Sequence, residues 1–148
     1  MSLKAQLQDD MKSAMRTRDK ERLAVIRMLM AAVKQREVDE RTELDDADIL
    51  AVLEKMIKQR RDAETQYRDA GRDELADAEA AEIGVLEHYQ PAQLSEAEID
   101  RAIESAIAEH DASSMRDMGA VMGTLKGRLQ GQADMAVVSQ RLKARLQG

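Results

Sequence analysis

The most unusual spacing in this sequence belongs to glycines that recur every four residues near the C-terminus. They are Gly119, Gly123, Gly127 and Gly131. Four-residue spacing places residues on one face of a helix, where each interior glycine costs roughly 0.5–1 kcal/mol relative to alanine. A core on the opposite face does not require glycine, so we expect a partner to approach this face closely. The flanking Arg116 and Lys126 favour an acidic helix or a phosphate chain as that partner.

Basic side chains accompany the glycines and continue to the end of the chain. With them, the candidate RNA-binding residues are Arg116, Gly119, Gly123, Lys126, Gly127, Arg128, Gly131, Arg141, Lys143 and Arg145. Lys and Arg neutralise phosphates, and a bare glycine strip lets a sugar–phosphate backbone lie close to a helix. Aromatic residues make up only 1% of the chain, so no stacking platform for single bases is expected. The pattern predicts recognition of duplex or folded RNA by its shape. Packing of another part of this chain on the glycine strip is the alternative interpretation.

The remaining reactive side chains form no recognisable catalytic or metal-binding pattern. His88 and His110 each fall near the end of an acidic helix, where favourable charge placement explains them. Asp45, Asp46 and Asp48 are interpreted as helix-capping residues, because no further hard ligand follows at the loop spacing of a metal site. The glycine region lacks the Gly-Lys-Ser/Thr order of a phosphate-binding loop. We therefore assign no catalytic residue, no metal ligand and no cofactor.

The composition predicts an all-α protein. Of 148 residues, 43% are hydrophobic, but only two are Tyr and none is Phe or Trp. Leu, Ile, Val, Met and Ala must therefore fill the core, which favours helices over sheet. The longest apolar run covers only residues 28–33, too short to span a membrane. With no cysteine in the chain, we expect a cytoplasmic protein without disulfides and without a membrane partner.

The net charge of −6 conceals a strong partition along the chain. Residues 1–36 hold nine Lys or Arg against four Asp or Glu, and residues 112–148 hold six against two. The middle segment, residues 37–111, holds eight basic residues against 23 acidic ones. Two basic ends thus flank an acidic middle, which permits an anionic partner at the ends. Alternatively, the ends pack against the middle and neutralise it.

Apolar periodicity predicts seven helices in two domains, residues 1–91 and 92–148. About four helices form the first domain, starting after Ser2, after Asp19, at Asp45 or Asp46, and near Leu75. The only proline, Pro91, ends the fourth helix and marks the boundary. In the second domain a capping box at residues 95–98 starts the first helix of a small three-helix bundle. Ser113 or Ser114 then caps the glycine helix and Asp134 caps the last one. The predicted core includes Met15, Leu75, Ala78, Ile83, Leu86, Tyr89, Met115, Met118, Met122, Leu125 and Leu129.

Three stretches resemble the GatB/YqeY family, and more closely its free-standing YqeY-like members. They are Arg18-Asp-Lys-Glu-Arg-Leu23 with Arg27-Met-Leu29, then Tyr89-Gln-Pro-Ala-Gln-Leu-Ser95, and finally the stretch 112–123 with Gly131-Gln-Ala-Asp134. The resemblance implies a YqeY-like helical domain in residues 1–91. It also implies that residues 92–148 are similar to the tail of the tRNA-dependent amidotransferase B subunit, a helical module that contacts tRNA. The large catalytic domain of that enzyme is missing here.

Three functions follow as hypotheses. The first is an accessory RNA-binding protein of translation, with tRNA as the ligand that the resemblance implies. The second is an adaptor that docks a basic protein partner through its acidic first domain. The third is a carbon–nitrogen ligase with glutamine as amide donor, which rests on the family's label alone. Gln130 and Gln132 stand where we expect the family to favour Lys or Arg, which weakens the predicted RNA affinity.

Overall fold

The computed structural model describes residues 1–148 and confirms the all-α prediction, with seven α-helices, one 3₁₀ turn and no strand. The chain divides into two compact units, Met1–Gln90 and Pro91–Gly148. No helix combines the length and apolar character needed to cross a lipid bilayer.

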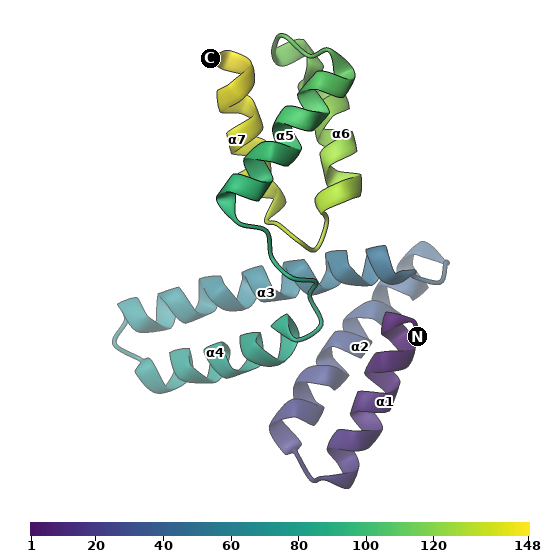
Figure 1. The fold of residues 1–148 in the computed structure, drawn as a ribbon. Coiled ribbons are helices and arrows are strands. Elements are labelled where there is room, and N and C mark those ends of the chain that lie inside the picture. The colour runs from purple at the N-terminus through teal and green to yellow at the C-terminus, as the bar shows by residue number, and fades with distance from the viewer. The chain divides into compact units, whose positions relative to one another are not determined.

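The first unit consists of two helical hairpins (Figure 1). Its helices are α1 (Leu3–Arg16), α2 (Lys20–Glu40), α3 (Asp46–Asp69) and α4 (Asp73–Glu87). The predicted caps of the first three are confirmed: Ser2, Asp19 and Asp45 each accept a backbone N–H with the side chain. Asp48 returns the bond to the Asp45 backbone and completes a capping box.

The core of the first unit corrects part of the predicted apolar pattern. Met15 is 51% exposed, Leu75 is 40% exposed and Ala78 is exposed. On α4 the predicted Ile83 and Leu86 are buried, and Ala76 is the buried residue near the start of the helix in place of Leu75 and Ala78. Spacings of seven and three residues share a helix face, and Leu75 lies about 100° from Ala76 around the axis. The error is therefore confined to the beginning of α4.

Tyr89 closes this unit by joining the end of α4 to the first hairpin. Its hydroxyl, on a side chain that is 6% exposed, donates to Asp10 Oδ2 at 2.6 Å. Arg22 Nη2 lies 3.7 Å from the other oxygen of the same carboxylate. Burial and the bond to Asp10 raise the pKa of the Tyr89 phenol to about 12, so it remains a donor at neutral pH. Two of the stretches that carry the family resemblance thus meet at Asp10.

The second unit is a bundle of three helices, α5 (Glu96–His110), α6 (Met118–Leu129) and α7 (Met135–Gln147), with a 3₁₀ turn at Met115–Asp117 before α6 (Figure 1). Ser95 and Asp134 cap α5 and α7 as predicted. The core residues are Ile99, Ile103, Ala106, Val121, Leu125, Leu129, Ala133, Val138 and Leu142.

Met115, placed in the core by the sequence pattern, is 39% exposed. It belongs to the 3₁₀ turn and so does not share the phase of the following helix. Val121 takes the central position on the buried face of α6 instead. Met118 and Met122 pack at the margin of this core and are half-buried.

Substitution Tyr89→Phe is expected to destabilise the protein by roughly 1–2 kcal/mol, because a carboxylate loses a short hydrogen bond within a mostly buried site. Thermal unfolding monitored by circular dichroism measures the change. Tyr67→Phe is the matched control, since Tyr67 is half-buried and its hydroxyl has no hydrogen bond within the protein. Equal losses in the two variants would contradict a specific role for the bond to Asp10.

Candidate nucleic-acid interface

Asp117 organises the turn that leads into α6. Its Oδ2 accepts the backbone N–H of Ser113 at 2.9 Å and of Ser114 at 3.1 Å, and these bonds lower the pKa of the carboxyl. In return, the Ser114 hydroxyl accepts the backbone N–H of Arg116 at 3.4 Å. This local network fixes the residue, Met118, at which α6 begins.

The buried side of α6 determines where its glycines point. Val121 and Leu125 are fully buried at a spacing of four residues. Gly119, Gly123 and Gly127 have the same spacing on the other side of the helix and are exposed. Apart from the two neighbouring residues and the backbone of α6 itself, no atom lies within 4 Å of a Cβ added at any of the three. Within the second unit, the alternative interpretation that another helix covers the glycine strip is therefore wrong.

Gly131 does not belong to that strip, and its predicted place on the helix face is wrong. The helix ends at Leu129, and Gly131 is buried in the following turn with a φ of 83°. Its carbonyl accepts a hydrogen bond from Gln93 Nε2 at 2.7 Å, while the Gln132 carbonyl accepts the N–H of Leu94 at 2.9 Å. This glycine supplies the left-handed backbone of a turn that holds the segment before α5.

Three of the predicted RNA-binding arginines are paired with acidic residues of α5. Arg141 contacts both oxygens of Asp100, at 2.7 and 2.6 Å, and thereby lowers the pKa of that carboxyl. Arg145 lies 2.6 Å from Glu104, and Arg128 lies 2.6 Å from Glu109. The acidic helix thus neutralises much of the positive charge that the sequence assigns to RNA.

Arg116, Lys126 and Lys143 keep their charge available, because none of them forms an ion pair. All three are exposed. Lys126 lies on α6 between Gly123 and Gly127, and Arg116 lies one turn before Gly119. Of the ten predicted residues, Gly119, Gly123, Lys126 and Gly127 lie on the exposed side of α6, and the exposed Arg116 lies in the 3₁₀ turn directly before this helix. We call this surface the glycine face.

His110 lies in the last turn of α5, as predicted, and contacts α6. Its Nε2 is 2.6 Å from the hydroxyl of Thr124, the neighbour of Gly123. The contact ties the end of α5 to the middle of α6 and thus supports the orientation of the glycine face. No group of three or more His, Cys, Asp or Glu gathers where it could hold a metal ion.

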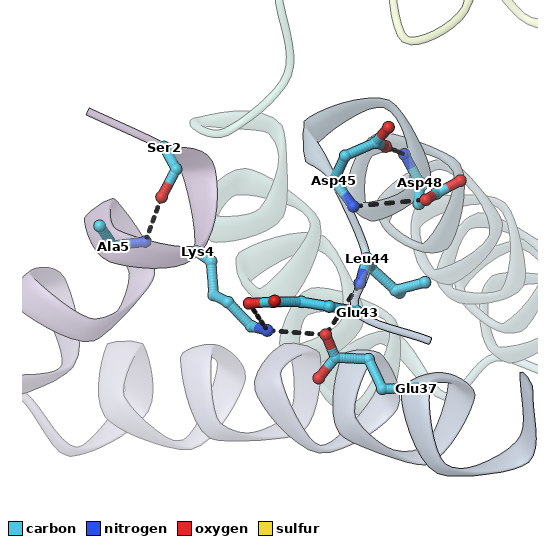
Figure 2. Close-up of polar contacts among 8 residues, drawn as sticks. All are labelled: Ser2, Lys4, Ala5, Glu37, Glu43, Leu44, Asp45 and Asp48. Carbon is cyan, nitrogen blue, oxygen red and sulfur yellow. Dashed lines mark hydrogen bonds and ion pairs between the residues drawn. The ribbon is translucent and has the colours of Figure 1, made fainter. Parts of the chain in front are cut away.

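Sequence reasoning missed a charge network in the first unit, which Figure 2 shows. Lys4 Nζ lies 2.7 Å from Glu37 Oε2 and 3.5 Å from Glu43 Oε1. Glu37, whose side chain is only 11% exposed, also accepts the backbone N–H of Leu44 at 2.9 Å. The bonds from Lys4 and Leu44 lower the pKa of Glu37, and the bond to Glu37 raises that of Lys4.

This network joins the start of α1 to the end of α2 and to the loop before α3. Leu3 adds a backbone hydrogen bond to Asp46 Oδ1 at 2.9 Å. Lys4, Glu37 and Glu43 connect three segments of the same unit, so we interpret the network as a structural clamp. Separations of 33 and 39 residues between the partners leave no local signal from which it could be predicted.

The three motif stretches extend over both all-α units of the chain. The model of the Yqey-like protein family matches residues 4–146. The chain belongs to the YqeY-like family, as the sequence resemblance indicated.

Curated relatives are fungal proteins named "Altered inheritance of mitochondria protein 41, mitochondrial". The one from Pyrenophora tritici-repentis is 30% identical over 93% of this chain and 77% of its own length. Those from Kluyveromyces lactis and Lachancea thermotolerans are 36% and 32% identical over 60% and 71% of this chain. This chain spans 48% and 58% of the length of the latter two.

These relatives correct the expectation of a cytoplasmic protein, which is wrong by this comparison. All three are named as mitochondrial proteins and point to a mitochondrial rather than a cytoplasmic location. The absence of cysteines and of a long apolar run constrains disulfide chemistry and membrane insertion, and neither property specifies a compartment.

Substitution Glu37→Gln is expected to lower the melting temperature at pH 7, because Lys4 loses its closest anion. The pKa of Glu37 is lowered in the folded state, so its contribution is present above the unfolded-state value near 4.5 and is lost as pH falls through the folded value. The difference from wild type should therefore shrink below pH 4.5. Melting temperatures of both proteins between pH 7 and pH 3 provide the measurement.

Glu43→Gln is the control, since the Glu43 side chain is 83% exposed and lies farther from Lys4. A Glu43→Gln effect as large as that of Glu37→Gln would argue against the clamp.

Proposed function

We propose that this protein is an accessory RNA-binding protein, and that the glycine face of the second unit lies against the backbone of a structured RNA. The family resemblance suggests tRNA as the class of RNA. The observation that supports the proposal is the open glycine face, on which no side chain of the unit occupies the space next to Gly119, Gly123 and Gly127.

Close approach explains why glycine, and not alanine, would be retained there. On an exposed helix interior, alanine is more favourable than glycine by roughly 0.5–1 kcal/mol, so three glycines carry a considerable cost. That cost has a physical purpose if a bulky backbone must reach the helix. Lys126 and Arg116, at the margins of the strip, would contact its phosphates.

The division between paired and free basic residues sets the expected strength of binding. Arg128, Arg141 and Arg145 are held by α5, which leaves Arg116, Lys126 and Lys143 for phosphates. About three contacts correspond to a slope of log K against log salt of roughly −2 to −3. Binding of this kind is moderate and strongly weakened by salt.

The adaptor and ligase hypotheses remain predictions. The adaptor relies on the acidic stretch 37–111, and recovery of a basic protein partner from a nuclease-treated lysate would support it. The ligase rests on the family label, and ammonia release from glutamine by the purified protein would support it. We prefer the RNA proposal because the second unit has an open surface with unpaired cations that could contact phosphates.

Titration of fluorescently labelled tRNA at several salt concentrations tests the proposal. The double variant Arg116→Glu with Lys126→Glu should bind about tenfold more weakly than wild type, because phosphate contacts are replaced by repulsion. Arg101→Glu is the matched control, since Arg101 is an exposed, unpaired residue on the solvent side of α5. A slope shallower than about two ion equivalents, or equal losses in both variants, would contradict the proposal.

A further inference from the structure

The first unit carries a second accumulation of available positive charge. Six basic side chains on the hairpin of α1 and α2 are exposed and form no ion pair, and we call them the basic hairpin: Lys12, Arg16, Arg18, Lys20, Arg27 and Lys34. The acidic side chains near them are Asp9, Asp19, Glu21 and Glu37. Asp19 is engaged in capping α2, and Glu37, which also attracts Lys34, is engaged by Lys4. Asp10 is engaged by Arg22 and Tyr89. A positive excess therefore remains on the surface of an acidic protein.

Many of the other basic residues of this unit are paired. Lys4 and Arg36, which flank the basic hairpin in sequence, both contact glutamates. On α3, Arg60, Arg61 and Arg68 all contact carboxylates of α4 or of their own helix. Within the basic hairpin only Lys34 lies near a carboxylate of the acidic middle, that of Glu37, so the predicted neutralisation by the middle does not apply to the other five residues.

The six charges follow the length of the hairpin in a regular pattern. Lys20, Arg27 and Lys34 recur every seven residues, which places them on one side of α2 and spreads them over about 21 Å. A surface groove of about 470 Å³ between α1 and α2 is lined by Gln8, Ala31 and Lys34 together with the paired Lys4 and Glu37, so Lys34 lies where α2 faces α1. Lys12 and Arg16 continue along α1 at four-residue spacing.

Arg18 occupies a position in the turn between these helices where the backbone favours glycine. Its φ is 57°, in the left-handed region, just after the end of α1. A non-glycine residue there costs of order 1 kcal/mol. Arg41, at the end of α2, has the same conformation with a φ of 53° and is also exposed and unpaired. The two arginines therefore form a matched pair that differs in location, since only Arg18 belongs to the basic hairpin.

We infer that the basic hairpin is a second phosphate-binding surface, which engages the same RNA as the glycine face and so rests on the proposed function. Evenly spaced cations over two helices match the repeating charge of a nucleic-acid backbone. A protein partner would require a contiguous apolar centre, but the large apolar side chains exposed on this hairpin are scattered: Met15 lies on α1, and Met28 and Val38 lie ten residues apart on α2. RNA is therefore favoured over an acidic protein.

Binding of labelled tRNA by the full-length Arg18→Gly and Arg41→Gly variants tests this inference. Both changes remove one positive charge and relieve one left-handed residue, so neither should lower the melting temperature. Arg18→Gly should weaken tRNA binding about fivefold at 0.1 M salt and make the salt slope shallower by about one, while Arg41→Gly should leave both unchanged. The double variant Lys12→Gln with Arg27→Gln should weaken tRNA binding more than Arg18→Gly does. Both residues lie on helices, so this variant tests the basic hairpin independently of the turn at Arg18.

The outcomes separate this inference from the proposed function. One outcome would overturn only the role of the basic hairpin. In it, tRNA binding is lost in the Arg116→Glu with Lys126→Glu variant but is equal in the Arg18→Gly and Arg41→Gly variants. Binding that responds only to the basic hairpin variants would support it and overturn the glycine face. Poly-glutamate binding that matches tRNA binding in strength and in its response to Arg18→Gly would overturn the assignment to RNA.

Discussion

The four-residue repeat of α6 is the constraint on which the second unit depends. Val121 and Leu125 must face the core, and a helix period of 3.6 residues then directs Gly119, Gly123 and Gly127 to the solvent. Burial of one side thus determines the exposure of the other. Because the capped turn at Asp117 fixes where α6 begins, the glycine face has one defined orientation on the bundle.

Charge pairing determines which basic residues are available to a partner. Acidic residues of α5 hold Arg128, Arg141 and Arg145, and similar pairs join α3 to α4 in the first unit. Many of the residues that escape pairing belong to two surfaces, the glycine face and the basic hairpin. A protein with a net charge of −6 can therefore present positive surfaces, because its acidic residues are largely used internally or placed on other helices.

Local signals in the sequence predicted most of the fold, whereas the site depended on contacts between distant residues. Ser2, Asp19 and Asp45 were recognisable as caps because a cap involves residues two or three positions away. At the start of α4 the buried residue was mispredicted, since Ala76 and Leu75 are both apolar and only packing distinguishes them. The pairing of Arg141 with Asp100, 41 residues away, has no local signature, so the sequence alone overstated the charge available to RNA.

Replacing Gly119, Gly123 and Gly127 together with alanine separates a functional glycine strip from a tolerated one. Each change is expected to stabilise α6, by roughly 0.5–1 kcal/mol per residue, because the added Cβ meets nothing. Gly84→Ala is the control, since Gly84 is another exposed helical glycine with open space around it. If a polyanion lies against the strip, the triple variant will be more stable than wild type yet bind tRNA more weakly, while Gly84→Ala will bind normally. Unchanged tRNA affinity in the stabilised triple variant would contradict that role.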